Sequence, residues 1–422
     1  MAKGKMTMAE LKKLTRNKSF VPQTSDLKQG DKGDDAKRLQ DYLTKFGYME
    51  SPATEAFGLI KNMVAAAPEQ EGNFDKNTEQ ALARFQKFNG LKATGKMDKR
   101  TLDLMSQPRC GFPDTADFVL EGRKWNKTEL TYSYSGFTPD LSQAQVRGAM
   151  TEAFNLWAVV TPLTFTEVAS GADIVIRFVG GSHGDGSAFD GPSGVLAHAF
   201  YPPPNSGALA GDVHFDEAET WTVNLPPSGI DLATVAGHEI GHALGLAHSN
   251  VNGALMFAFY GGAHRKLESD DVAGIQAIYG AVNRQANWRW CSKCGGLHFG
   301  GNPAGTCPAG GKHVKTGSGN YSLAHNSPAA LGQANWRWCS KCGGLHFGGN
   351  PAGPCPAGGN HIKTGSGNYT LAHNSPAAPG QANWRWCSKC GGLHFGGNPA
   401  KPCPAGGTHI KTGSGNYTLL QV

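Results

Sequence analysis

The sequence lacks several features that would place it in a familiar class of protein. Its 422 residues contain no apolar run near the roughly 18 residues that a membrane-spanning helix needs. The first 22 residues are basic and polar, without the apolar stretch of about 7–15 residues that marks a secretory signal. The 39 basic and 33 acidic residues give a net charge of only +6, which is too diffuse to indicate nucleic-acid binding. We therefore expect no membrane span and no nucleic-acid partner, and the length predicts about two to four domains.

Cysteine is scarce outside one region of the chain. Of the ten cysteines, only Cys110 lies before residue 290, and the other nine form three groups of three. Groups with an odd number of cysteines argue against a simple disulfide framework within each group. Glycine, in contrast, is abundant at 58 residues, and much of it follows residue 290.

The most informative stretch begins at His238 and reads His-Glu-Ile-Gly-His-Ala-Leu-Gly-Leu-Ala-His. His238 and His242 are four residues apart, so a helix would present both on one face, where they can hold one Zn²⁺. Gly245 can end the helix in a left-handed conformation and let the chain return with His248 as the third ligand. Three protein ligands leave one position for water, as in a catalytic zinc site. Glu239 beside them is the expected general base that takes the proton of that water.

A second motif, Pro-Arg-Cys-Gly-Phe-Pro-Asp, lies at residues 108–114. A Cys110 thiolate is a strong zinc ligand and can fill the open fourth position. Arg109 and Asp114 can pair across the turn and hold its shape. We expect Cys110 to be an inhibitory zinc ligand, and the alternative is a lone buried cysteine.

These motifs resemble the matrixins, the matrix metalloproteinase-like branch of the metzincins. Met256 looks like the family's Met-turn, and residues 108–114 look like its cysteine switch. Residues 26–107, with helical apolar spacing at 34–43 and 78–88, resemble its peptidoglycan-binding-like prodomain. The resemblance implies an extracellular zinc metalloendopeptidase zymogen, a monomer, which cleaves internal bonds of proteins, extracellular matrix-like substrates among them.

The same resemblance implies further metal sites and a substrate pocket. Thr234 occupies the position that often sets the depth of the S1′ pocket. A structural zinc with a closed shell of four ligands is implied at His183, Asp185, His198 and His214. A calcium ion is implied at Asp190, Gly191, Ser193, Val195, Asp216 and Glu219. A second calcium site is implied at Asp173, Ala208, Ala210 and Asp212, where the two alanines stand at positions of carbonyl donors.

The end of the chain is a threefold repeat with a period of 48 residues, marked by Asn-Trp-Arg-Trp-Cys at residues 287, 335 and 383. Two arrangements compete, and they can coexist: one β-trefoil-like domain, or three zinc-ribbon-like beads. Three sets have Cys₃His zinc-ligand spacing, with disulfides or buried free thiols as the alternative: Cys291, Cys294, Cys307 and His313; Cys339, Cys342, Cys355 and His361; Cys387, Cys390, Cys403 and His409. The tryptophans suit either a small core or binding of polysaccharide or matrix.

The predicted fold is a multidomain α+β chain. Its catalytic part is expected to be a twisted, mainly parallel sheet with three helices, between a helical prodomain and an all-β repeat domain. The expected divisions are a basic leader (1–25), the prodomain (26–107), the switch and activation segment (108–124), the catalytic domain (125–281) and the repeats (283–422, as 285–332, 333–380 and 381–422). Rival functions are a peptidoglycan endopeptidase, motivated by residues 26–107, and a glycan-binding repeat protein with a vestigial protease.

Overall fold

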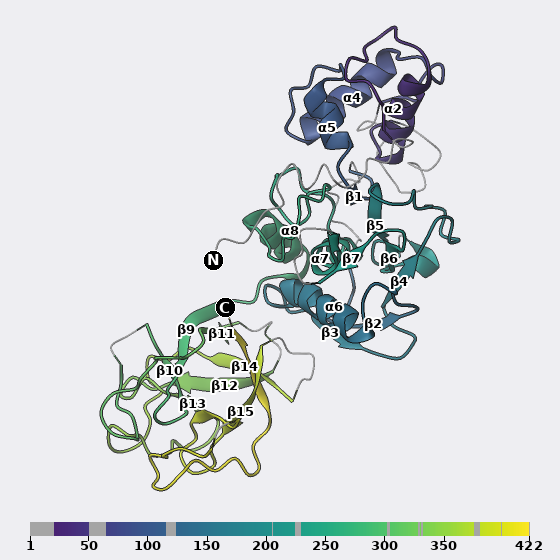
Figure 1. Ribbon diagram of the computed structural model, residues 1–422. Coiled ribbons are helices and arrows are strands. Elements are labelled where there is room, and N and C mark those ends of the chain that lie inside the picture. The colour runs from purple at the N-terminus through teal and green to yellow at the C-terminus, as the bar shows by residue number, and fades with distance from the viewer. Residues whose placement is uncertain are drawn as a thin grey trace. The chain divides into compact units, whose positions relative to one another are not determined.

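The computed structural model describes residues 21–49, 65–114, 124–204, 206–223, 229–301, 304–327, 330, 332–374, 380–397 and 399–421. Most of the expected leader and most of the activation segment therefore lie outside the described residues. The chain divides into two compact units, residues 1–157 with 165–279, and residues 158–164 with 280–422 (Figure 1). Among the described residues, no helix combines the length and apolar character needed to cross a membrane.

The first unit begins with three helices that gather at one end of it (Figure 1). Two of them start at aspartate caps, since the carboxylates of Asp75 and Asp98 accept hydrogen bonds from Thr78 N and Thr101 N. The apolar faces of all three helices pack together and bury Leu39, Tyr42, Phe85 and other residues in one cluster. The predicted helical region is confirmed as α2 (Asp34–Lys45), α4 (Lys76–Phe88) and α5 (Lys99–Met105).

The rest of the first unit is built on a six-stranded sheet in the order β1-β5-β6-β4-β2-β3. Strands β2, β4 and β6 are parallel, β5 is antiparallel to β6, and β1 adds to the edge parallel to β5. The predicted mainly parallel sheet is confirmed. The strands are β1 (Arg109–Cys110), β2 (Glu129–Tyr134), β3 (Thr164–Glu167), β4 (Ile174–Val179), β5 (Val195–Ala199) and β6 (Val213–Asp216).

Three helices accompany this sheet, as predicted: α6 (Gln143–Ala158), α7 (Leu232–Ala243) and α8 (Ser269–Tyr279). All twelve residues of α7 are buried, and the helix packs against β5 and β6. It ends near Gly245, whose φ of 105° lies in the left-handed region that glycine adopts without strain. Shorter elements are the 3₁₀ turn η2 (Gly207–Leu209) and the paired strands β7 (Trp221–Thr222) and β8 (Ile230–Asp231).

The second unit is all-β and repeats three times. In each repeat a hairpin is followed by a third strand, and the three third strands β11, β14 and β17 all pair with one another. The hairpins are β9 (Arg284–Trp290) with β10 (Leu297–Phe299), β12 (Gln333–Trp338) with β13 (Leu345–Phe347), and β15 (Gln381–Trp386) with β16 (Leu393–Phe395). The third strands are β11 (Tyr321–His325), β14 (Tyr369–His373) and β17 (Tyr417–Gln421).

The three repeats share one core. Trp288 of the first repeat packs edge-on against Tyr369 of the second at 5.0 Å between ring centroids. The same contact between different repeats occurs in two further pairs, Trp336 with Tyr417 and Trp384 with Tyr321. Each of these tryptophans is fully buried, so they form the core. The predicted threefold all-β domain is confirmed, and three independently folded beads are excluded because each repeat completes the core of another.

Candidate metal centre and active site

Helix α7 presents the two helical histidines toward the same side. Asp231 caps its first turn by accepting hydrogen bonds from Thr234 N at 3.1 Å and Thr234 Oγ1 at 2.6 Å. His238 and His242 follow one turn apart, and the chain returns after Gly245 to bring His248 beside them. All three imidazoles are buried.

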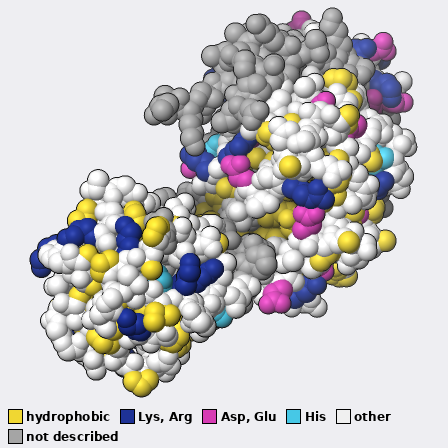
Figure 2. Space-filling view, turned by 60° about the horizontal axis from the view of Figure 1, so that its bottom comes forward, with side chains coloured by type: hydrophobic (Ala, Val, Ile, Leu, Met, Phe, Trp, Pro, Cys, Tyr) yellow, Lys and Arg dark blue, Asp and Glu magenta, His cyan; other side chains and the backbone are white. Residues whose placement is uncertain are grey.

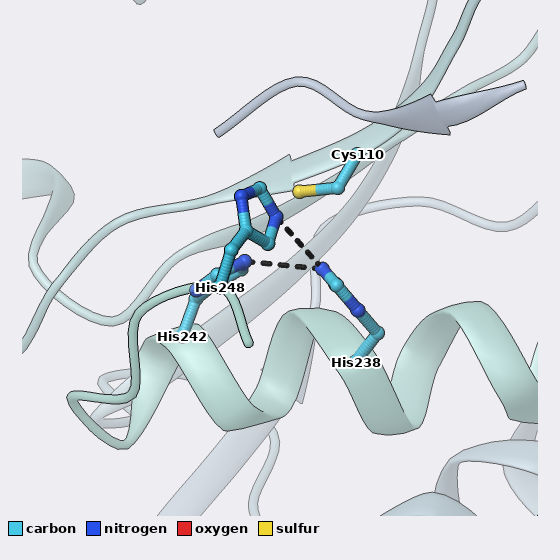
Figure 3. A group of neighbouring side chains, drawn as sticks. All are labelled: Cys110, His238, His242 and His248. Atoms are coloured by element: carbon cyan, nitrogen blue, oxygen red, sulfur yellow. Dashed lines mark hydrogen bonds between the residues drawn. The ribbon is translucent and has the colours of Figure 1, made fainter. Parts of the chain in front are cut away.

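The three imidazoles aim their Nε2 atoms at one point, together with the thiol of Cys110 (Figure 3). Nε2 of His238 lies 3.1 Å from that of His242 and 3.2 Å from that of His248. The Nδ1 atoms face oxygen acceptors, since His238 Nδ1 lies 2.8 Å from Leu255 O and His242 Nδ1 lies 2.7 Å from Leu246 O. Nδ1 must therefore carry the proton in both rings, which leaves each Nε2 with a lone pair. Converging lone pairs repel one another unless a cation lies between them, so this donor set fits Zn²⁺.

Cys110 reaches the histidines because its segment extends the edge of the sheet. Arg109 N donates to Gly194 O at 3.0 Å and Gly111 N donates to Ala197 O at 2.8 Å, on the side of β5. On the other side Cys110 N donates to Ala258 O at 3.0 Å. Burial and the Glu239 carboxylate raise the pKa of the Cys110 thiol well above its ordinary value. The thiolate is thus favoured here only with a cation beside it, which again fits zinc.

Glu239 is buried next to the same point. Its Oε2 lies 3.4 Å from Cys110 Sγ, and its Oε1 has no hydrogen-bond partner in the part of the chain that the structure describes. Burial raises the pKa of Glu239 to about 8. A cation at the metal position would lower this pKa again and keep Glu239 ionised, which is the form that accepts a proton.

The ion pair predicted to brace the switch segment is present and buried. Arg109 donates to the Asp114 carboxylate, and the guanidinium also lies 3.4 Å from the centroid of the Phe46 ring and 4.7 Å from that of Phe259. Burial alone would raise the pKa of Asp114, but the positive charge of Arg109 outweighs it and holds this pKa at about 2. The pair therefore stays ionised between an aromatic ring of the N-terminal helices and one of the segment after Met256.

Asp114 also makes contacts that the sequence pattern did not reveal. Tyr48 Oη donates to Asp114 Oδ2 at 2.7 Å, and His248 Nδ1 lies 2.9 Å from Asp114 Oδ1. Phe112 stacks on the His242 ring at 4.4 Å between centroids. The switch segment is therefore joined to the helical region and to two of the zinc-site histidines at once.

A cavity of about 480 Å³ opens beside the metal position, and Thr234 is among the residues that line it. Leu196, Val235 and Phe259 also line it, which makes its wall largely apolar. The Thr234 hydroxyl donates to Asp231 and accepts from His264 N at 2.8 Å. Its hydrogen-bonding capacity is satisfied within the protein, so Thr234 contributes shape rather than a polar contact for a ligand.

The turn at Met256 lies under the active helix. A side chain at Gly241 would overlap Met256 Sδ, so a glycine is needed for this close approach. The turn is held by Asp271, whose carboxylate accepts hydrogen bonds from Leu255 N at 2.8 Å and Met256 N at 3.0 Å. Sequence reasoning missed this role for Asp271, and its only signal was a pair of acidic residues in the first turn of α8.

The residues proposed for a structural zinc form a second tight group. Asp185 Oδ2 lies 2.6 Å from His183 Nε2, 2.7 Å from His198 Nε2 and 2.8 Å from His214 Nδ1. Burial disfavours the charged Asp185 carboxylate, but these histidines outweigh it and hold the pKa of Asp185 well below its ordinary value. Three nitrogens around one carboxylate fit a closed four-ligand zinc site.

The residues proposed for calcium are close but less tightly grouped. Ser193 N donates to Glu219 Oε1 at 2.6 Å, and Val195 N donates to Asp190 Oδ1 at 2.8 Å. Burial raises the pKa of Glu219 to about 8 and that of Asp216 above its ordinary value, with further contributions from neighbouring carboxylates. Such a group of buried carboxylates fits a divalent cation that would keep them ionised. Gly191 lies in the same loop.

The second proposed calcium site is not assembled in the same way. Asp173 accepts hydrogen bonds from Thr131 and pairs with Lys127 at 2.7 Å. Burial raises the pKa of Asp212 to about 6. Ala208 lies in η2 and Ala210 caps that turn. Because Lys127 already neutralises Asp173, these four residues fit a cation less well than the first set does.

Two family models match the chain. Residues 124–280 match the family described as "Matrixin", and residues 32–105 match the one described as "Putative peptidoglycan binding domain". Interstitial collagenase of Equus caballus is 54% identical over 203 residues, which cover 47% of this chain and 42% of that protein. Neutrophil collagenase of Homo sapiens is 45% identical over 250 residues, which cover 58% and 50% of the two chains.

The chain spans about half the length, or less, of these curated relatives. The matched region contains the whole histidine motif and the turn at Met256, and the preceding match covers the three N-terminal helices. The chain is therefore similar to the matrixin family over residues 124–280 and to the peptidoglycan-binding domain family over residues 32–105.

Proposed function

We propose that this protein is the zymogen of an extracellular zinc-dependent metalloendopeptidase that cleaves proteins of the matrix class. The observation that carries the proposal is the convergence of three buried imidazole Nε2 atoms on one point, with Cys110 Sγ and the Glu239 carboxylate beside it. Relatives named collagenases, similar over the same region, support protein substrates. The extracellular location is proposed from the resemblance to the matrixins.

Zinc held by His238, His242 and His248 would polarise the substrate carbonyl and acidify a water molecule. Glu239 takes the proton of the attacking water and then delivers it to the nitrogen of the leaving amine. The charge of the zinc would keep Glu239 ionised for the first step, and burial favours its protonated form for the second. The apolar cavity beside Thr234 would receive the substrate side chain that follows the cleaved bond.

Latency follows from the position of the switch segment. Residues 108–111 lie between β5 and the segment after Met256, where they use backbone hydrogen bonds of the edge strand. An extended substrate needs the same edge to align its scissile bond near Glu239. Cys110 therefore blocks both the metal and the substrate strand until the segment is displaced.

The test is Glu239→Ala in the activated protein, with the exposed Glu129→Ala as the matched control. Glu239→Ala should lose about 10²–10⁴-fold in kcat/KM on a fluorogenic gelatin-type peptide, because general base catalysis contributes about that factor. Its bound zinc should equal that of the control. Undiminished turnover would refute the role of Glu239. Cleavage of purified cell wall in place of the peptide would favour the peptidoglycan endopeptidase.

A second function, attachment to an acidic polysaccharide, is favoured by the charge of the repeats. Residues 281–422 contain twelve Lys and Arg residues and no Asp or Glu, so the modest net charge of the chain hides a strongly basic unit. The unit at the lower left of Figure 2 presents dark-blue side chains in several places. A cavity of about 550 Å³ in this unit is lined by Trp338, Tyr369, His325 and Asn326, which combine flat rings with hydrogen-bonding groups.

This attachment is tested by deleting residues 283–422 and by replacing the exposed Lys315, Lys363 and Lys411 with Gln in the full chain. Both changes should leave cleavage of a small peptide intact and weaken retention on a sulfated polysaccharide column. Retention by the parent should fall steeply with salt. Equal retention of parent and variants would refute the targeting role.

A further inference from the structure

The nine repeat cysteines lie in three buried groups of the same construction. In the first repeat, Sγ of Cys291, Cys294 and Cys307 and a ring nitrogen of His313 all lie within 4.8 Å of one another. The second and third repeats place their equivalent residues within the same limit. All three copies of the repeat therefore bring the same four donor atoms together.

The sulfur positions do not fit disulfide bonds. Cys291 Sγ lies 3.9 Å from Cys307 Sγ, and the equivalent pairs in the other two repeats are also 3.9 Å apart. A disulfide would require about 2.05 Å. Two thiolates bound to one tetrahedral zinc at about 2.3 Å would lie roughly 3.8 Å apart, which is close to the observed value. The ring Nδ1 atoms lie 3.5–3.6 Å from the second cysteine of each group, also in keeping with a shared ion.

The backbone around each group is shaped for metal ligation. After the second cysteine, Gly295 has a φ of 73°, and its N–H donates to Cys291 O at 2.8 Å, which folds the two cysteines onto the same side. Val314 N donates to Cys291 Sγ at 3.4 Å. The other repeats show the same bond from Ile362 to Cys339 and from Ile410 to Cys387. An N–H directed at sulfur favours the thiolate, which is the form that binds a metal.

The groups are also tied into the contacts between repeats. The carbonyl of the glycine after each second cysteine accepts a hydrogen bond at 2.9 Å from a phenylalanine N–H of another repeat. These bonds run from Phe299 to Gly343, from Phe347 to Gly391 and from Phe395 to Gly295, so they close a ring. An ion that holds one cysteine turn therefore also holds the point where the next repeat attaches.

We propose that each repeat binds one structural Zn²⁺ through its three cysteines and one histidine, and that the three ions together stabilise the shared core. The ligands are Cys291, Cys294, Cys307 and His313, with their counterparts Cys339, Cys342, Cys355 and His361, and Cys387, Cys390, Cys403 and His409. Four protein ligands close the shell, so these ions are structural and take no substrate. Ligation also protects nine thiols from oxidation outside the cell.

The experiment counts zinc in the full-length chain carrying Glu239→Ala to prevent autolysis. With the two sites of the matrixin domain, the parent should hold five Zn²⁺ per chain, one for each donor group among the described residues. Cys294→Ser, Cys342→Ser or Cys390→Ser should each lower the count by one. Cys110→Ser makes the same chemical change outside the repeats and should leave five, because three histidines remain at that site. A parent count of two, unchanged by the repeat substitutions, would overturn the proposal.

A second measurement does not depend on how the variants fold. The native parent is treated with iodoacetamide, with and without a chelator, and each cysteine is located by peptide mass. The repeat cysteines should stay unmodified until the chelator is added and then react together. Alkylation of all nine cysteines at equal rates with or without chelator would mean free thiols. A protein mass lower by two hydrogens for each pair of cysteines would mean disulfides. Either result would refute zinc binding. Peptidase activity plays no part in either result, so the proposed function can fail or hold independently.

Discussion

Replacing Asp114 with Asn should release the latent enzyme without any proteolytic cut. In the closed state Arg109 is 1% exposed, and its counter-ion is the fully buried Asp114 carboxylate. Asn has nearly the same shape but no charge, so the guanidinium would remain buried without its partner. Removing one member of a buried ion pair typically costs about 3–5 kcal/mol. This cost applies only to the closed state, because displacement of the segment returns Arg109 to water.

The expected size of the effect follows directly. At about 1.4 kcal/mol for each factor of ten, the open fraction should rise by roughly one hundred- to a few thousandfold. The matched control is Tyr48→Phe, which removes the hydrogen bond to Asp114 at 2.7 Å and keeps the ion pair. A hydrogen bond to a charged group contributes about 1.5–3 kcal/mol, so this control should raise the open fraction by only about ten- to a hundredfold.

The assay is the initial rate at which the uncut full-length chain hydrolyses a fluorogenic peptide with no activator present. Parent and Asp114→Asn are then processed beyond residue 114 and compared again, where equal kcat/KM is expected because residue 114 has been removed. If the uncut variant is as silent as the parent, the Arg109–Asp114 pair does not hold the switch closed. If the processed forms differ, Asp114 acts on folding of the catalytic part, and the reasoning also fails.

Three further experiments test the switch segment and the metal site. Cys110→Ser should give an active full-length protein, since a hydroxyl is a poor zinc ligand, and a variant as silent as the parent would count against the switch. Phe112→Ala removes the ring stacked on His242 and should raise the activity of the uncut chain, while Phe112→Tyr should keep it latent. A chelator should abolish the activity of the processed enzyme and added Zn²⁺ should restore it; activity that persists at full chelation would contradict the metal mechanism.

The catalytic ligands were predictable because their geometry is local. His238 and His242 share a face by helical spacing alone, and Gly245 supplies the left-handed residue that brings His248 back. Cys110 lies far from them in sequence, and only its chemistry and the family resemblance connected it to the site. Its neighbours Tyr48 and Phe46 belong to the helical region, and no local pattern relates a tyrosine to an aspartate 66 residues later.

The repeats show a different limit of sequence reasoning. The period of 48 residues predicts that each copy has the same environment, but it does not say whether a tryptophan meets a tyrosine of its own repeat or of another. Trp288 meets Tyr369, so the core forms by exchange between copies. The overall net charge also concealed the basic character of this unit, since the acidic residues all lie before it. Both properties depend on distant parts of the chain, which periodicity does not record.

The switch segment and the histidine ligands meet at Asp114. Each ligand histidine directs Nδ1 at an oxygen, and for His238 and His242 that oxygen belongs to the catalytic part itself. For His248 it belongs to Asp114 of the switch segment, at 2.9 Å. Partners of this kind orient metal ligands, and their loss typically weakens metal binding by about 10–100-fold. We therefore expect displacement of the segment to remove both the Cys110 ligand and the carboxylate that faces His248, and the processed form to hold zinc less tightly than the uncut chain.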